Sequence, residues 1–360
     1  SEVHDEITIS HFEANLYTGK AQALFGPGTE AIGLITQATI LFIGGNMVLK
    51  NELSIGELTA FILFLTSFFA PIQSLVQLYN QYQQGNASIV KLRNLLSTVP
   101  SVCEKENAIE MPKLVGCVEL KSVDFSYEID KPVLRDVDLK VESGEVLALV
   151  GSTGAGKSTI INLLSRFYEF DSGDIKIDGT SIRDYALSDL RMHVAVVLQD
   201  VFLFADTIYN NITLYNPKIS LDQVQKAAKE IGVHEFISSL PGGYQYNVKE
   251  RGVMLSAGQR QLIAFLRAFL SKPTILILDE ATSSIDSYSE ELIQTATDTI
   301  TKGKTSLIIA HRLATIQNAD WIVVMDQGLI VEVGTQKELL NKKNGYYQKL
   351  HQVQFSEVES

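Results

Sequence analysis

Nine consecutive residues, GSTGAGKST, combine glycine, lysine and hydroxyl side chains at a spacing suited to binding phosphate. They fit the pattern G-x-x-x-x-G-K-[ST], follow the apolar run Val146 to Val150 and open a helix-forming stretch, which is the context that this pattern requires. Glycine lets the backbone wrap a phosphate chain, Lys157 supplies positive charge, and the Ser158 hydroxyl is a ligand for Mg²⁺. We therefore expect a nucleoside triphosphate site. The residues expected to bind phosphate are Gly151, Ser152, Thr153, Gly154, Ala155, Gly156, Lys157, Ser158 and Thr159.

Two carboxylates end a second apolar run, TILILDE, which spans Thr274 to Glu280. An acidic pair after a strand is often only a helix cap. Beside a phosphate-binding loop, a catalytic interpretation is favoured. Asp279 is then expected near Mg²⁺ and Glu280 near the γ-phosphate, where its carboxylate polarises an attacking water.

Two further apolar runs, VAVVLQ and SLIIAH, end in Gln199 and His311. One polar residue after a strand is usually structural, but the carboxyl ends of parallel strands meet at one edge of a sheet, where ligands bind. All these strand endings are explained by one cluster of Lys157, Gln199, Asp279, Glu280 and His311. Tyr127 ends an earlier strand and fits equally an ordinary sheet aromatic and a ring stacked on a nucleotide base.

A second anion-binding pattern, LSAGQ, precedes the helix-forming stretch Arg260 to Leu270. Around Ser256, Gly258 and Gln259, free backbone N–H groups coincide with the positive end of a helix dipole. The pattern contains no lysine, so it supplies only half of a phosphate site. The alternative is an ordinary Ser/Gly helix cap.

Composition narrows the class of protein. The 360 residues carry a net charge of −12 with no run dense in lysine and arginine, which argues against nucleic acid as a partner. The two cysteines, Cys103 and Cys117, fit neither a disulfide framework nor a metal-binding pattern, and we interpret them as reduced cytosolic residues.

Two long stretches carry no charge, residues 31–49 and residues 58–90, and the apolar part of the second is 58–78. A helix of about 20 apolar residues crosses the hydrocarbon core of a bilayer. Because the short polar stretch KNELSIGE separates them, we predict a membrane-spanning helical hairpin. The alternative is a pair of buried core helices. Neither stretch fits a signal peptide, since the first starts late and a second span follows at once.

The chain is expected to divide into a helical membrane part (1–96), a linker of broken periodicity (97–116), a region in which strands alternate with helices (117–353) and a tail (354–360). The ordered set GSTGAGKST, Gln199, LSAGQ, ILILDE, SSID and AHR resembles the nucleotide-binding domain of ABC transporters over about Val115 to Gln352. QDVFLFADTIYNNI, ERGVMLSAGQRQ and the two preceding spans resemble the exporter branch. The resemblance implies an α/β P-loop NTPase domain with a parallel core sheet, an antiparallel β subdomain and a helical subdomain, preceded by an all-α transmembrane segment.

The resemblance also implies residue roles. They are adenine stacking by Tyr127, Mg²⁺ binding by Ser158, Gln199 and Asp279, general base catalysis by Glu280, and contact with the γ-phosphate by His311. In a head-to-tail dimer, Ser256, Gly258 and Gln259 complete the ATP site of the second subunit, and Asp286 lies along the interface. Gln199 reports nucleotide state to the membrane helices.

Three positions depart from the family pattern. Ala257 stands where the family usually has Gly, so its methyl group is expected to crowd the phosphate and to lower turnover modestly. Lys249 stands before Glu-Arg-Gly where Gly is common, and SSID replaces Ser-Ala-Leu-Asp. The earlier membrane helices of an exporter half are missing, so we interpret the sequence as a fragment of a longer chain.

The expected function is therefore that of an ATP-binding and ATP-hydrolysing exporter subunit that uses ATP and Mg²⁺. Its expected partners are membrane lipid, an unidentified substrate and a second half-transporter, in a homodimer or a heterodimer. We expect a multi-pass protein of the inner or plasma membrane with a cytoplasmic nucleotide-binding domain. The alternatives are a soluble or peripheral P-loop ATPase with a mechanical or regulatory role and a nucleotide-binding scaffold without hydrolysis. Lipids, amphipathic drugs and peptides all stay open as substrates.

Overall fold

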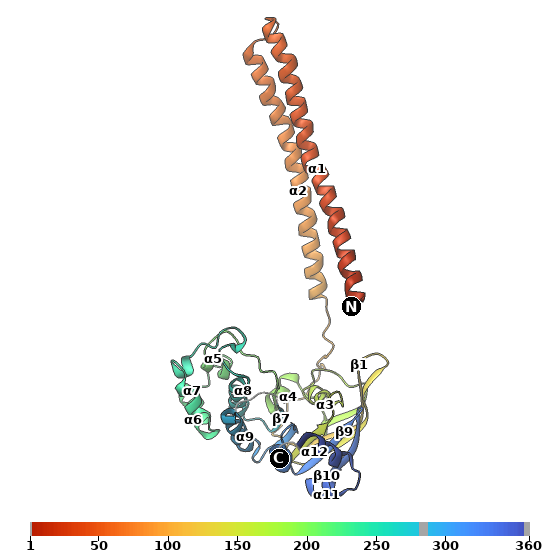
Figure 1. Ribbon diagram of the computed structural model, residues 1–360, viewed down its shortest axis with the longest axis vertical. Coiled ribbons are helices and arrows are strands. Elements are labelled where there is room, and N and C mark those ends of the chain that lie inside the picture. The colour runs from red at the N-terminus through yellow and green to blue at the C-terminus, as the bar shows by residue number, and fades with distance from the viewer. Residues whose placement is uncertain (1, 281–286, 356–360) are drawn as a thin grey trace. The chain divides into compact units, whose positions relative to one another are not determined.

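The computed structural model describes residues 2–280 and 287–355 (Figure 1). The chain forms two compact units, Ser1–Val99 and Pro100–Ser360. Their boundary falls within the expected linker. Asp286 and the end of the expected tail, residues 356–360, lie outside the described residues.

The first unit is a hairpin of two helices, α1 (Glu2–Leu49) and α2 (Ile55–Leu96). A capping box fixes where α2 begins, because the Ser54 hydroxyl accepts from Glu57 N at 3.2 Å and the Glu57 carboxylate accepts from Ser54 N at 2.9 Å. The helices approach closely at the buried Gly44, where a Cβ atom would lie 2.4 Å from a methyl carbon of Leu58. Small residues allow such an approach between membrane helices.

The two helices of this hairpin differ in the length of their apolar stretches. Among the described residues, Ala31–Leu49 is long and apolar enough to cross a membrane, with a mean hydropathy of 1.7. The expected second span is represented by a shorter apolar stretch, Ile55–Phe68. Phe42 and Phe64 are each 74% exposed, so the hairpin leaves large apolar side chains uncovered by protein.

In the second unit, an antiparallel sheet has the order β2-β1-β4-β5. Its strands are β1 (Val118–Glu128), β2 (Lys131–Val141), β4 (Ser172–Ile177) and β5 (Thr180–Ser181). Along β1, buried Val118, Leu120, Val123 and Phe125 face the core, which they share with α3 (Lys157–Leu164). This sheet is the predicted antiparallel β subdomain.

The main sheet has the order β10-β9-β3-β8-β7-β6. Its strands are β3 (Val146–Gly151), β6 (Val194–Val197), β7 (Ile275–Asp279), β8 (Thr305–Ile309), β9 (Trp321–Asp326) and β10 (Leu329–Gly334). All neighbouring pairs are parallel except β9 and β10. Strand β8 is buried throughout, as expected for a parallel strand covered on both faces.

Several of the remaining helices lie together at one side of this unit (Figure 1). A helical subdomain contains α5 (Ile208–Thr213), α6 (Leu221–Glu230), α7 (His234–Ser239) and α8 (Ala257–Ser271), which share one hydrophobic core with α9 (Ser287–Thr301). The others are α4 (Leu187–His193), α10 (Leu313–Gln317), α11 (Gln336–Asn341) and α12 (Tyr346–Phe355). The predicted fold class is confirmed, and the structure adds the antiparallel strand β10 at the edge of the core sheet.

Candidate nucleotide site

A pocket of about 550 Å³ opens where the carboxyl ends of several core strands meet. Its lining includes the loop between β3 and α3 and three side chains predicted from strand endings, Gln199, Asp279 and His311. The lining residues are Tyr127, Val133, Thr153, Gly154, Ala155, Gly156, Lys157, Ser158, Thr159, Gln199, Asp279, Ile309 and His311. Segments far apart in the sequence therefore converge as the parallel-sheet argument predicts.

The glycines of this loop are required by close backbone packing. Gly151 has φ +154°, and a Cβ atom there would lie 2.2 Å from the carbonyl oxygen of Met325. Gly156 has φ +103° and precedes the first residue of α3, with its would-be Cβ atom 2.7 Å from a methyl carbon of Leu134. A side chain at either position would push the loop away from its neighbours, so the loop's shape depends on glycine.

The Lys157 ammonium group lies along the loop and is mostly buried, with the residue 7% exposed. Its Nζ donates to the carbonyl oxygens of Gly151 and Ser152 at 2.8 and 2.9 Å. Burial lowers the Lys157 pKa and nearby Asp279 opposes that shift, while burial raises the pKa of Asp279 and Lys157 opposes it. A buried amine within a glycine-rich loop is suited to an anion such as a phosphate chain.

Oxygen ligands for a divalent cation come from three elements. The Ser158 hydroxyl is exposed at the start of α3, Asp279 ends β7, and Gln199 is exposed just after β6. Within the described part of the chain, no group of three or more His, Cys, Asp or Glu side chains could hold a metal. One carboxylate with two neutral oxygens suits Mg²⁺ that is held mainly by substrate phosphates and water.

Tyr127 stands at the edge of the pocket with 46% of its surface exposed. Its hydroxyl donates to Thr159 Oγ1 at 3.3 Å and accepts from Asn162 Nδ2 at 3.0 Å, which ties the ring to α3. The rings of Phe125 and Tyr168 pack edge-on against it, with centroids 4.7 and 5.0 Å away. The ring is thus held in place yet open to a ligand, which favours the base-stacking hypothesis over an ordinary sheet aromatic.

Glu280 is the one expected catalytic residue that does not line the pocket. It is 3% exposed, and its carboxylate accepts hydrogen bonds from the Thr315 hydroxyl and from the backbone N–H groups of His311 and Arg312, the latter two at 3.1 and 3.3 Å. Burial raises the Glu280 pKa, and these hydrogen bonds partly offset the rise. The sequence did not lead us to predict Thr315 as a partner of Glu280. The available signal was its position four residues after His311.

His311 reaches the pocket directly from the segment between β8 and α10. Burial, and secondarily the charge of Lys157, lower its pKa below the ordinary histidine value. The imidazole is therefore neutral at pH 7 and can donate one hydrogen bond to a ligand.

The LSAGQ residues are not brought into this pocket. Ser256 caps α8 through a capping box, in which its hydroxyl accepts from Gln259 N at 3.2 Å and Gln259 Oε1 accepts from Ser256 N at 3.0 Å. Ala257 is exposed and Gly258 is buried. The helix-cap alternative is thus realised, while the exposed end of α8 stays available to another molecule. The structure also explains why Gly is common at position 249, since Lys249 adopts φ +61°.

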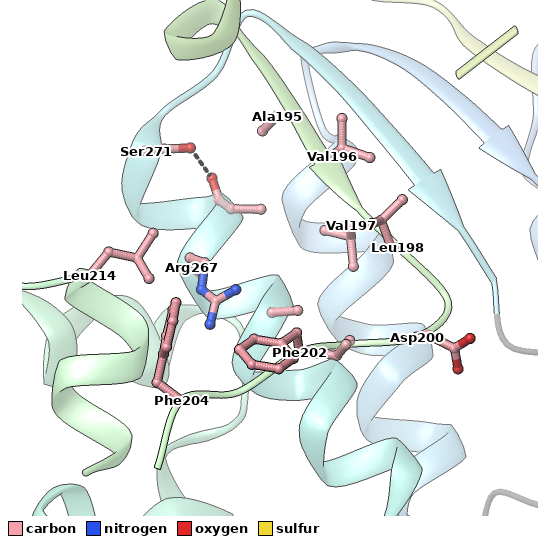
Figure 2. A pocket seen from close by; sticks show the side chains of 13 residues that line it. Ala195, Val196, Val197, Leu198, Asp200, Phe202, Phe204, Leu214, Arg267 and Ser271 are labelled. Atoms are coloured by element: carbon pink, nitrogen blue, oxygen red, sulfur yellow. Dashed lines mark hydrogen bonds between the residues drawn. The ribbon is translucent and has the colours of Figure 1, made fainter. Parts of the chain in front are cut away.

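A second pocket of about 490 Å³ is lined by residues of β6 and of the segment that follows it, and by residues of α8 (Figure 2). Exposed Phe202 and Phe204 line it together with Arg267, whose Nε donates to the Asn211 carbonyl oxygen at 3.0 Å. Asp200, the residue after Gln199, also lines this pocket. Consecutive residues of one segment therefore line the two pockets, Gln199 the nucleotide pocket and Asp200 the second pocket.

Comparisons with known proteins agree with this arrangement. Residues 134–283 match the family described as ABC transporter, and residues 3–72 match the ABC transporter transmembrane region. The chain is 42% identical over 335 residues to the ATP-dependent lipid A-core flippase of Syntrophus aciditrophicus, which covers 93% of this chain and 55% of the flippase. It is 41% identical to the fatty acid ABC transporter ATP-binding/permease protein of Mycobacterium bovis, covering 96% of this chain and 54% of that protein.

A solved structure of a bacterial Atm1-family ABC exporter with ATP bound is also similar. It superposes with a TM-score of 0.75 at 32% identity, covering 98% of this chain and 62% of the exporter chain. The chain belongs to the ABC transporter family. It spans roughly half the length of the curated relatives that it matches. The comparisons do not support a soluble or peripheral ATPase.

Proposed function

We propose that this chain is the ATP-binding and ATP-hydrolysing part of a membrane exporter half. The observation that carries the proposal is the pocket in which the P-loop, Tyr127, Gln199, Asp279 and His311 meet, in a chain that also has an apolar helical hairpin. Phosphate release by the full-length protein in lipid tests it. ATP-dependent release supports the proposal, and ATP binding without release would favour a nucleotide-binding scaffold.

Each residue of the pocket has a task in this proposal. Tyr127 stacks on the base, the P-loop amides and Lys157 hold the phosphates, and His311 donates to the γ-phosphate. Ser158, Gln199 and Asp279 hold Mg²⁺, which neutralises phosphate charge when bound. Glu280 accepts a proton from the attacking water once its carboxylate turns toward the pocket.

The hydrogen bond from Thr315 is expected to restrain Glu280. Replacing Thr315 by valine removes the only side-chain donor on that carboxylate among the described residues, so the carboxylate turns more readily toward the pocket. A hydrogen bond to a charged group contributes about 1.5–3 kcal/mol, which corresponds to a factor of about ten or more, and we expect basal ATPase activity to rise by up to about tenfold. Steady-state phosphate release measures it.

The matched control for this change is Thr297→Val, a buried threonine on α9 whose hydroxyl donates to the Ile293 carbonyl oxygen at 2.8 Å. That control should leave the ATPase rate within about twofold, because small core changes act mainly on stability. A lower rate in Thr315→Val than in the control would show that Thr315 assists the base and does not restrain it.

We further propose that two nucleotide-binding domains pair head to tail, so that Ser256, Gly258 and Gln259 of one subunit contact ATP held by the other. The exposed N-terminus of α8 supports this, because its backbone donors have no phosphate partner within their own subunit's pocket. The second half is a copy of this chain or a related chain. The proposed location is the inner or plasma membrane, with the nucleotide-binding domain in the cytoplasm.

Ala257→Gly is the substitution that tests contact at this surface. Ala257 is the exposed first residue of α8, at the helix N-terminus that a phosphate would approach in the proposed dimer. Removing the methyl group is expected to raise the ATPase rate by about threefold at most, since one methyl is a modest obstacle. Steady-state phosphate release and the melting temperature should be measured together. An unchanged rate at unchanged stability would refute the crowding argument.

A further inference from the structure

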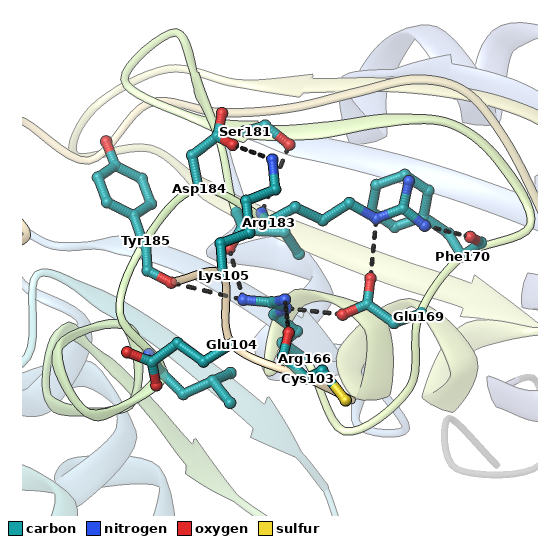
Figure 3. Close-up of polar contacts among 12 residues, drawn as sticks. Cys103, Glu104, Lys105, Arg166, Glu169, Phe170, Ser181, Arg183, Asp184 and Tyr185 are labelled. Atoms are coloured by element: carbon teal, nitrogen blue, oxygen red, sulfur yellow. Dashed lines mark hydrogen bonds and ion pairs between the residues drawn. The ribbon is translucent and has the colours of Figure 1, made fainter. Parts of the chain in front are cut away.

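The segment that follows α2 in the chain, residues 100–111, is attached to the loop between β5 and α4 (Figure 3). We call this segment the strap. Ile109 N donates to the Asp184 carbonyl oxygen at 2.8 Å, and the Ile109 carbonyl oxygen accepts from Ala186 N at 3.0 Å. Lys105 also forms an ion pair with the Asp184 carboxylate. The strap is therefore an ordered part of the nucleotide-binding unit and not a free tether.

A buried arginine joins the strap to the rest of this unit (Figure 3). Arg166 is 2% exposed, and its Nη2 donates to the Cys103 carbonyl oxygen in the strap at 2.9 Å. Its Nε pairs with Glu169 at 2.8 Å, and its Nη1 donates to the carbonyl oxygens of Ile182 and Tyr185 at 3.3 and 3.4 Å. A buried guanidinium is tolerated only when it is paired in this way, so these segments hold their positions together.

The same arginine is rigidly connected to the P-loop. Arg166 lies two residues after the end of α3, and α3 begins at Lys157. The helix is short, about 12 Å, and its apolar residues Ile160, Ile161 and Leu163 are fully buried. A short helix whose apolar side chains are fixed in a close-packed core moves as one piece, so a displacement at its phosphate-binding end reaches Arg166.

We propose that Arg166 is a positioning residue that couples nucleotide binding at the P-loop to the strap, and through the strap to the membrane helix that precedes it in the chain. The inference rests on the proposed ATPase function and goes beyond it. Arg166 is not among the residues that line the nucleotide pocket, so it acts through α3 and not on ATP. The element that both ends of the path can bias is the hydrogen bond from the guanidinium to the Cys103 carbonyl oxygen of the strap.

The test uses the full-length protein in lipid nanodiscs, carrying Glu280→Gln so that ATP is bound and not consumed. Hydrogen exchange of residues 100–111 is measured with and without Mg²⁺ and ATP, and ATP affinity is measured with a fluorescent ATP analogue. We expect ATP to change the exchange rate of the strap by about threefold or more. Arg166→Met should abolish that change while leaving ATP affinity within about twofold, because the pocket is intact.

Arg183→Met is the matched control. Arg183 pairs with the same Glu169 at 2.8 Å, but its guanidinium stacks over the Phe170 ring, 3.6 Å from the centroid, and donates to the Phe170 carbonyl oxygen. The control should keep the ATP response of the strap. Arg166→Lys serves if the methionine variant does not fold. It keeps the charge, and its single ammonium group cannot hold Glu169 and the Cys103 carbonyl oxygen in the same fork geometry.

The measurements distinguish failure of the Arg166 proposal from failure of the proposed ATPase function. Loss of the ATP response in the Arg166 variants, with the response kept in Arg183→Met, supports the proposal. The proposal is overturned if ATP still changes the hydrogen exchange of the strap in the Arg166 variants, or if Arg183→Met loses this change equally. It is also overturned if ATP binds to the protein with Arg166 and Arg183 intact without changing the exchange of the strap. A protein that binds no ATP would instead refute the proposed function, which the affinity measurement detects independently.

Discussion

Glu280→Gln is expected to stop steady-state ATP turnover while ATP binding is retained. The amide has nearly the shape of the carboxylate. Its oxygen can still accept from the backbone N–H groups of His311 and Arg312, and its NH₂ group can donate to the Thr315 hydroxyl. It cannot accept a proton from water, and loss of a general base costs about a hundredfold or more in rate. Phosphate release and binding of a fluorescent ATP analogue measure the two effects separately.

A buried glutamate outside the pocket provides the control for this change. Glu332 is buried and accepts from Tyr347 N at 2.9 Å, so Glu332→Gln makes the same chemical change without touching the nucleotide site. Its ATPase rate should match that of the unsubstituted protein. Undiminished turnover in Glu280→Gln would refute the assigned mechanism.

Protonation of Glu280 is expected to lower the ATPase rate at acid pH. A general base works only when it is deprotonated, so turnover falls as the pH drops through its pKa. Because burial raises the Glu280 pKa above that of an ordinary glutamate, this loss should begin at a higher pH than for an exposed carboxylate. A rate profile at saturating ATP measures it, with circular dichroism to show that the fold persists.

Lys157→Ala should weaken ATP binding itself, in contrast to the change at Glu280. The ammonium group is held against the P-loop by the carbonyl oxygens of Gly151 and Ser152, and it is the cation that faces Asp279. Truncating a buried charged partner of a phosphate costs about 2 kcal/mol or more, which is about a 30-fold loss of affinity. Titration with a fluorescent ATP analogue in the absence of turnover measures it.

Lys304→Ala is the control for removing a partly buried lysine. Lys304 lies over the Phe269 ring, 5.6 Å from the centroid, and burial lowers its pKa as it does that of Lys157. Its loss should leave ATP affinity within about twofold, because Lys304 lies outside the nucleotide pocket. If the two variants lowered affinity equally, the loss would reflect general destabilisation and not a phosphate contact.

The sequence by itself determined those features whose partners are neighbours along the chain. The P-loop glycines, Lys157 and Ser158 are readable because one strand, one turn and one helix position them locally. The meeting of Gln199, Asp279 and His311 is also readable, because parallel strands bring their carboxyl ends to one edge. The apolar run Ala31–Leu49 needs only length and composition to be recognised.

Only the tertiary structure decided which partner each polar side chain takes. Glu280 bonds to Thr315, 35 residues away, and does not line the pocket, although its place after β7 predicts a position near phosphate. Arg166 finds the Cys103 carbonyl oxygen 63 residues earlier, a contact without any sequence signal. The physical reason is that a buried polar group must be paired, and packing of distant segments decides which donors and acceptors lie within reach.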